Sequence, residues 1–350
     1  MVDFCGYQLP INYGSQIKEH EAVRDNAGMF DVSHMQILDL FGTNAKAFLR
    51  NLLSNDVNKL DKYGIGKALY SAMLNEGAGI IDDLIVYLLE DRYRIIANAA
   101  TREKDFNWIT ALATKFEVTV AVRNDLSILA VQGPNAIGLV AKVYPELSNA
   151  LNQLQPFNSI IYNNYLLART GYTGENGLEI LLPHNYASSL WEKLTKLGVK
   201  PCGLAARDTL RLEAGMNLYG HDMDETVPPC ECGMDWVVDL SDSSRDFIGK
   251  LAYISLKENK QTPLQIGVLL EGKGVLREGQ KIFINGNQVG KITSGTFSPT
   301  LKTSIAIARV YPLGDNATVD IRGNYEPIKF IKLPFVKNSN LSTERSKLNV

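Results

Sequence analysis

Residues 79–87 read Gly79-Ile80-Ile81-Asp82-Asp83-Leu84-Ile85-Val86-Tyr87, an apolar run that two adjacent acids interrupt. The run predicts a buried strand, joined by a turn at residues 75–79 to a preceding strand at residues 68–74. Because adjacent strand residues point to opposite faces, Asp82 and Asp83 cannot share one site as a catalytic pair. A buried carboxylate without a partner is costly or has a raised pKa, which makes these acids candidates for chemistry. The alternative is an acid at the end of a turn that accepts backbone N–H groups.

Strands and helices continue on both sides of this hairpin without a regular βαβ alternation. In the first third we expect a helix near residues 15–28 that Gly28 ends, a strand at 36–40, a helix at 44–53, a strand at 93–97 and a helix capped by Thr101. In the middle we expect strands at 126–131, 160–168 and 178–182, and helices from residue 136, near 185–197 and at 204–214. The mixture predicts an α+β fold without a dinucleotide-binding fingerprint.

After about residue 256 the pattern is one of short strands only. Residues 282–289 read Ile282-Phe283-Ile284-Asn285-Gly286-Asn287-Gln288-Val289, which predicts a hairpin with a type I′ turn. Short strands continue to Phe335, so we expect a small all-β barrel or sandwich. The polar residues 337–350 predict a frayed tail.

Composition narrows the class of protein. With 350 residues the chain fits two or three domains, and its net charge of -2 argues against binding nucleic acid. The sequence has no apolar run long enough to span a membrane, and its start lacks the features of a signal peptide. We therefore expect a soluble, cytoplasmic protein with no membrane partner.

The cysteines and histidines do not form a metal-binding pattern. Cys230 and Cys232 are two residues apart, but no second pair of ligands follows at suitable spacing, and the four histidines show no His-x-x-x-His spacing. We expect no metal site, and we interpret the four cysteines as reduced thiols.

Residues 169–180 contain a second candidate site, Arg169-Thr170-Gly171-Tyr172-Thr173-Gly174-Glu175-Asn176-Gly177-Leu178-Glu179-Ile180. Three glycines within seven residues predict a loop whose backbone can approach a ligand closely. Glu179 lies in the strand that follows, where its two oxygens could accept from a ligand edge with parallel N–H donors. The alternative is a glutamate that faces solvent.

The helix at residues 203–215 contains a third group of charges. Arg207 and Arg211 share a face at i, i+4 spacing, while Glu213 lies elsewhere. By itself this pattern predicts a solvated amphipathic helix.

Taken together, these segments resemble the aminomethyltransferase (T-protein) family from Met1 to about Phe335. Two of the matching segments are Met29-Phe30-Asp31-Val32-Ser33-His34-Met35 and Thr293-Ser294-Gly295-Thr296-Phe297-Ser298-Pro299-Thr300-Leu301. The others are residues 1–4, 67–70, 81–87, 98–100, 132–134, 169–179 and 206–219.

The resemblance implies a three-lobed fold that binds folate. We expect a first lobe from residues 1–40 plus 124–205, a second from 41–123 plus 206–255, a C-terminal β-barrel domain from 256–336 and a tail from 337–350. The implied reaction is a step of glycine cleavage. The aminomethyl group on the lipoyl arm of the H-protein passes to tetrahydrofolate, giving 5,10-methylene-tetrahydrofolate and ammonia and leaving the dihydrolipoyl carrier. Glycine cleavage P- and L-proteins would be indirect partners.

The resemblance also assigns residues to roles. Asp83 matches the catalytic carboxylate, and Glu179 matches the acid that binds the pterin amino edge. The remaining positions that match the folate pocket are Tyr70, Asn98, Phe157, Tyr172, Arg207 and Lys337. Lys337 stands where the family often has arginine, and lysine offers a point charge in place of a planar fork.

Three alternatives remain open from the sequence. An iron–sulfur assembly factor of the same fold would carry Lys-Gly-Cys-Tyr-x-Gly-Gln-Glu, where this chain has Asp246-Phe247-Ile248-Gly249-Lys250. A demethylating enzyme with sulfonium or methylated-glycine substrates would use the same lobes. A non-catalytic folate-binding or carrier-docking module would not need both Asp83 and Glu179.

Overall fold

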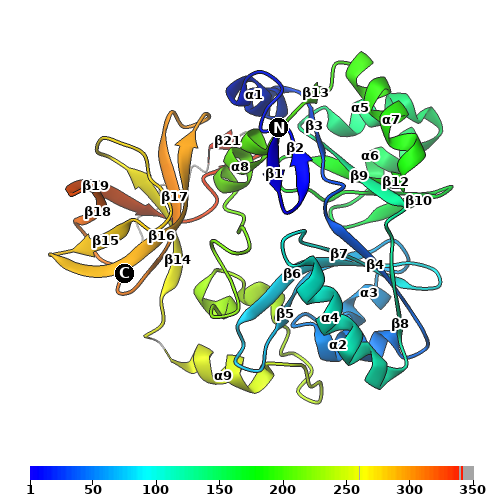
Figure 1. Cartoon of the computed structure of the whole chain (residues 1–350), viewed down its shortest axis with the longest axis horizontal. Coiled ribbons are helices and arrows are strands. Elements are labelled where there is room, and N and C mark those ends of the chain that lie inside the picture. The colour runs from blue at the N-terminus through cyan, green and yellow to red at the C-terminus, as the bar shows by residue number, and fades with distance from the viewer. Residues whose placement is uncertain (260, 339, 342–350) are drawn as a thin grey trace.

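The computed structural model describes residues 1–259, 261–338 and 340–341 (Figure 1). Its β-structure consists of a six-stranded sheet, a five-stranded sheet, a closed barrel and two small two-stranded sheets. Helices accompany both larger sheets, so the predicted α+β class is confirmed. In the described part of the chain, none of the helices is long and apolar enough to cross a membrane.

The first sheet has six strands in the order β10-β11-β12-β9-β3-β13. Their bounds are Ser159–Tyr162, Tyr165–Ala168, Gly177–Pro183, Leu126–Gln132, Gly28–Asp31 and Lys200–Pro201. Helices α5 (Ala136–Val143), α6 (Ser148–Gln153) and α7 (His184–Lys196) cover one face, where Val131, Ile180 and Leu190 share a core. The predicted strand at 160–168 is in fact the hairpin β10–β11, because Asn163 turns the chain with a φ of 52°.

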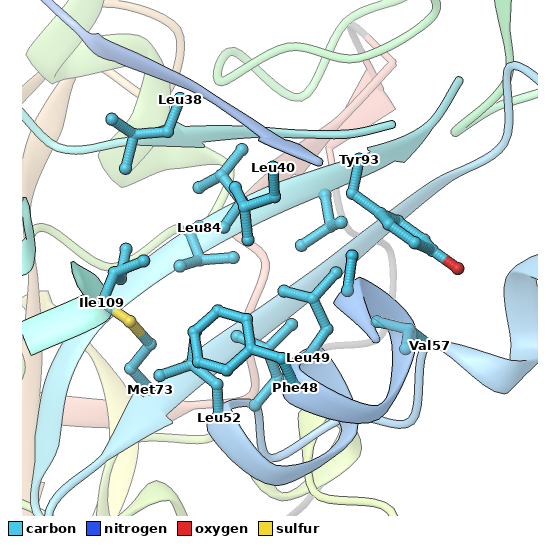
Figure 2. Packing of buried hydrophobic residues seen from close by; sticks show 14 of the residues in the cluster. Leu38, Leu40, Phe48, Leu49, Leu52, Val57, Met73, Leu84, Tyr93 and Ile109 are labelled. Carbon is cyan, nitrogen blue, oxygen red and sulfur yellow. The ribbon is translucent and has the colours of Figure 1, made fainter. Parts of the chain in front are cut away.

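The second sheet has five strands in the order β5-β6-β7-β4-β8. Their bounds are Ala68–Leu74, Ile80–Leu88, Tyr93–Ala97, Gln36–Phe41 and Thr119–Val122. Helices α2 (Ala45–Leu52) and α4 (Arg102–Ala113) cover one face, and Figure 2 shows Phe48 and Ile109 packed against Leu40 and Leu84. Because β4 pairs with β7 and β8, it lies in this sheet, although the lobe boundary predicted at residue 40 would assign most of it to the first lobe. The division into lobes stays a prediction.

The uncovered faces of the two sheets meet in a shared core. From the second sheet, Ile85 and Tyr87 of β6 face this core, and from the first sheet Leu181 of β12 does so. Side chains two residues apart on a strand point to the same face, so Asp83 lies on the face of Ile85 and Tyr87. Glu179 lies on the face of Leu181 for the same reason. Both acids therefore belong to the sheet faces that meet between the two sheets.

The C-terminal strands form a closed six-stranded barrel in the order β14-β17-β16-β15-β18-β19, with β14 pairing to β19. Their bounds are Leu264–Leu270, Thr303–Val310, Asn287–Ser298, Lys281–Ile284, Ala317–Ile321 and Asn324–Ile331. Asn285 and Gly286 have φ values of 51° and 80°, which the predicted type I′ turn requires. The structure thus selects the barrel over the sandwich.

The remaining elements connect these bodies. They are β1 (Val2–Phe4), β2 (Tyr7–Leu9), α1 (Gln16–Asp25), α3 (Asn58–Asp61), α8 (Leu204–Glu213), α9 (Lys250–Glu258), β20 (Val336–Lys337) and β21 (Asn340–Leu341), with short 3-10 helices at Thr114–Phe116, Pro145–Leu147, Pro229–Glu231 and Asp235–Val237. Gly28 begins β3 and does not end α1, whose C-cap is Asn26. Thr101 precedes α4, but its side chain does not cap the helix. Of the predicted tail, residues 339 and 342–350 lie outside the described residues.

Helix α8 lies between the barrel and the six-stranded sheet (Figure 1). Glu213 is fully buried and accepts from Arg24 Nη2 at 2.8 Å and from Thr300 Oγ1 at 2.8 Å. Arg211 is 4% exposed and donates to Asp222 at 3.0 Å. The prediction of a solvated amphipathic helix is therefore wrong, because contacts with the barrel and with α1 bury Arg211 and Glu213.

We expect Glu213→Gln to lower the free energy of unfolding by about 3 kcal/mol, because it removes one partner of a buried ion pair. Burial favours protonation of Glu213, but the hydrogen bond from His20 and the charges of His20 and Arg24 outweigh it and lower the pKa of Glu213 to about 2. The stability from this ionised group is complete above its ordinary pKa of 4.5 and is lost as the pH falls toward 2.

Urea unfolding at several pH values measures both effects. The difference between wild type and Glu213→Gln should shrink on acidification through this window, with the exposed Glu192→Gln as a control. A difference that is equally small at pH 7 in both variants would contradict the role of Glu213.

Candidate active site

Asp83 lies on β6, and neutral donors hold its carboxylate. Tyr70 on the neighbouring strand β5 donates its hydroxyl to Asp83 Oδ2 at 2.7 Å, and the Asn98 side-chain amide donates to Oδ1 at 2.9 Å. Burial, followed by the negative charge of Asp82, raises the pKa of Asp83 from 3.8 to about 7, although both hydrogen bonds oppose the rise. A carboxyl group with this pKa can exchange a proton near neutral pH.

Asp82 points to the other face of β6, as the alternation of the strand predicted. It is fully buried, on the side where Leu84 and Val86 pack under α4. Asn98, directly after β7, nevertheless contacts both acids, because its side-chain amide also donates to Asp82 Oδ1 at 2.9 Å and its backbone N–H donates to Oδ2 at 3.1 Å. The two acids are thus on opposite faces but are joined through one amide.

Trp236 completes the surroundings of Tyr70, and the sequence reasoning did not identify it. Its ring stacks on Tyr70 with centroids 5.3 Å apart and an interplanar angle of 19°, while 62% of the side chain is exposed. The stacking fixes the ring whose hydroxyl binds Asp83.

Glu179 lies on β12 and also has a neutral donor. The Thr170 hydroxyl donates to Glu179 Oε2, and the Tyr87 hydroxyl lies 3.3 Å from the same Thr170 oxygen. Burial raises the pKa of Glu179, while the Thr170 hydrogen bond and the charge of Arg207 oppose the rise. Since Tyr87 belongs to β6 and Thr170 precedes β12, these contacts join the two sheets.

Arg207 and Tyr172 link the two acids through charge interactions. The Arg207 guanidinium is 4.6 Å from the centroid of the Tyr172 ring, and the Tyr172 hydroxyl donates to the Asn217 carbonyl. The charges of Asp83 and Arg207 act on the pKa of Tyr172, and the charge of Glu179 acts on the pKa of Arg207. The half-buried Arg207 side chain makes no hydrogen bond with any residue in the described ranges, so its N–H groups are available to a ligand.

Phe157 and Lys337 are less closely connected to the other predicted site residues. Phe157 has a φ of 58° and is 38% exposed, and its backbone carbonyl accepts from Ala68 N–H at the start of β5. Lys337 is exposed on β20. Neither side chain makes a hydrogen bond or ring contact with the other six predicted residues in the part of the chain that the structure describes.

Other features do not coincide with this group of residues. A surface hollow of about 410 Å³ between α4 and α9 is lined by Trp108, Phe116 and Leu251, among others, and by none of the predicted site residues. In the described ranges, no group of three His, Cys, Asp or Glu side chains could hold a metal ion. All four cysteines are free.

Comparisons with known proteins agree with this geometry. Residues 1–242 match the model of the GCVT N-terminal domain, and residues 264–337 match the glycine cleavage T-protein C-terminal barrel domain. The chain is 52% identical to an aminomethyltransferase of Chromobacterium violaceum over 97% of this chain and 93% of that protein, and 53% identical to one of Neisseria meningitidis with the same coverage. It is similar to the solved structure of glycine cleavage system aminomethyltransferase T from Bartonella henselae, with a TM-score of 0.88, 34% identity and coverage of 97% and 95% of the two chains.

The chain belongs to the glycine cleavage T-protein family, and it has that family's three-lobed fold with a C-terminal barrel. It is an enzyme, an aminomethyltransferase of the glycine cleavage system, as the sequence predicted.

Proposed function

We propose that this aminomethyltransferase uses tetrahydrofolate as its one-carbon acceptor and the lipoylated H-protein as its donor, with Asp83 as the catalytic residue. The observation that carries the proposal is the half-buried Asp83 carboxylate between two sheets, which Tyr70 and Asn98 hold without an ion pair to any cation of the described residues. Tetrahydrofolate supplies the ring nitrogens that take up the one-carbon unit.

The surroundings of Asp83 fit this chemistry. An ionised Asp83 stabilises positive charge that develops at the reacting carbon and accepts a proton from the reacting nitrogen. Tyr70 and Asn98 fix the carboxylate in one orientation, so that little reorganisation is needed during the reaction. The partial burial of Asp83 restricts water, which would otherwise compete for a reactive one-carbon group.

The second group of residues fits the recognition of a pterin. Glu179 offers carboxylate oxygens to the N–H donors of a pterin edge, and only Oε2 accepts from Thr170. Arg207 offers N–H donors beside the Tyr172 ring. We propose Tyr70, Asn98, Tyr172, Glu179 and Arg207 as folate-binding residues, with Phe157 as an aromatic wall and Lys337 near the folate tail.

The partner and location assignments rest on the family. Membership in the glycine cleavage T-protein family supports the H-protein as the direct partner. The indirect partners, the P- and L-proteins, and the cytoplasmic location stay predictions.

Asp83→Asn should lower kcat by at least ~100-fold, because an amide cannot accept the proton or carry the charge. Folate binding should stay within about threefold of wild type, since Asn keeps the size of the side chain. In wild type, kcat/KM should fall as the pH drops below about 7, because the active form of Asp83 is the ionised one.

The assay is folate-dependent release of ammonia from the aminomethyl-lipoyl H-protein. The exposed Asp315→Asn is the matched control, and sarcosine and dimethylsulfonio-propionate test the demethylating alternatives. An Asp83→Asn enzyme with wild-type kcat would rule out the role of Asp83. Turnover of sarcosine in place of the carrier substrate would rule out the proposed donor.

Glu179→Ala should weaken tetrahydrofolate binding at least ~10-fold, because it leaves buried pterin donors without an acceptor. The measurement is the folate Kd by calorimetry, with Glu192→Ala on the exposed face of α7 as control. Unchanged affinity in Glu179→Ala would show that the pterin lies elsewhere.

A further inference from the structure

A buried acid on helix α4 has no place in the mechanism described above. Asp105 is fully buried, and neither of its carboxyl oxygens accepts a hydrogen bond of ordinary geometry from the described residues. It occupies the apolar side of α4, one turn before Ile109, where its carboxyl group faces that of Asp82. The nearby Thr101 hydroxyl donates to the Asn98 carbonyl at 3.2 Å.

Two carboxylates in contact repel each other, whereas a carboxylic acid and a carboxylate can share one proton. Asp82 already accepts two hydrogen bonds from Asn98, which stabilise its ionised form. Asp105 is therefore the natural donor of the shared proton. Burial and the proximity of Asp105 raise the pKa of Asp82 far above its usual range, and burial raises the pKa of Asp105 to about 6, so the pair retains one proton at neutral pH.

The groups around the pair do not offer a better partner. The charge of Lys104 on α4 acts on Asp105, but its ammonium donates to the Ile81 carbonyl at 2.8 Å, to the Tyr219 hydroxyl at 2.8 Å and to Glu225 at 2.7 Å. Tyr219 in turn donates to the Ile80 carbonyl at 3.0 Å. In the described part of the chain, neither Asp82 nor Asp105 has an ion pair.

Asn98 connects the pair to Asp83. Its side-chain amide lies 2.9 Å from Asp82 Oδ1 and 2.9 Å from Asp83 Oδ1. The negative charge of Asp82 also disfavours ionisation of Asp83. On the other side, Asp83 faces Tyr70, Tyr172 and the Cys232 thiol, which are neutral at pH 7. The charge of the pair and the orientation of Asn98 thus both act on Asp83.

We propose that Asp82 and Asp105 share one proton and form a positioning pair for Asp83. The shared proton limits the pair to one negative charge and fixes Asp82 as the acceptor that orients Asn98. Asn98 in turn presents its amide to Asp83. The pair does not touch the substrate, and its effect on turnover rests on the proposed role of Asp83.

The first test looks for the proton itself in the ligand-free protein. Infrared difference spectra at pH 8 should show one protonated carboxyl group in wild type. That signal should be lost in Asp82→Asn and in Asp105→Asn but retained in Asp83→Asn and Asp315→Asn. Its absence from wild type, or its survival in both pair variants, would overturn the proposal even if Asp83 is catalytic.

The second test separates hydrogen bonding from packing at residue 105. Asp105→Leu keeps the size but offers no donor, so kcat should fall at least ~10-fold with folate Kd within about threefold. Asp105→Asn can donate to Asp82 and should restore most of the turnover that Leu loses. Equal losses in both folded variants would overturn the proposal. If Asp105→Leu does not fold, the loss or survival of the infrared signal in Asp105→Asn tests the shared proton instead. Full turnover in Asp83→Asn would refute the catalytic role of Asp83. The infrared measurement would still test the shared proton independently.

Discussion

This structure depends on how its buried and half-buried carboxylates are stabilised, either by a cation or by neutral hydrogen-bond donors. Arginines pair with two of the buried acids that connect parts of the fold: Arg94 binds Asp39 at 2.6 Å inside the five-stranded sheet, and Arg24 binds Glu213 between α1 and α8. Around Asp83 the structure supplies neutral donors instead. An acid without a cation keeps a raised pKa, which is costly for stability but suits proton transfer at neutral pH. Asp83 therefore differs from Asp39 and Glu213, whose carboxylates are paired with arginines.

The sequence predicted most of the fold because its signals are local. The two acids within residues 79–87 alternate across β6 as the period of a strand requires, and the Asn285-Gly286 turn forms as its residue types demand. The errors arose where distant segments decide. Helical spacing cannot show that Arg211 and Glu213 are buried, because their partners Arg24, Asp222 and Thr300 come from distant segments. The pairing of β4 with strands more than fifty residues away is also not visible in local signals, and the division into lobes stays a prediction.

The candidate site was likewise predictable from local signals only in part. Asp83 and Glu179 could be selected because each places a charge in a strand that reads as buried, and the structure gives both raised pKa values. Asp105 could not be selected, although it lies in line with Ile109 on an apolar helix face, since its partner Asp82 precedes it by a turn, a strand and a loop. The roles of Phe157 and Lys337 came from the family resemblance alone, and within the described ranges their side chains make no hydrogen bond or ring contact with the other predicted site residues.

The central claim is that Asp83 is a half-buried acid with an unusually high pKa. The direct measurement is a titration of its carboxyl carbon by NMR in the ligand-free protein, assigned with Asp83→Asn. The account predicts a midpoint near 7. A midpoint close to 4, the usual value for aspartate, would mean that solvent or a cation reaches the carboxylate and that this site does not hold a proton at neutral pH.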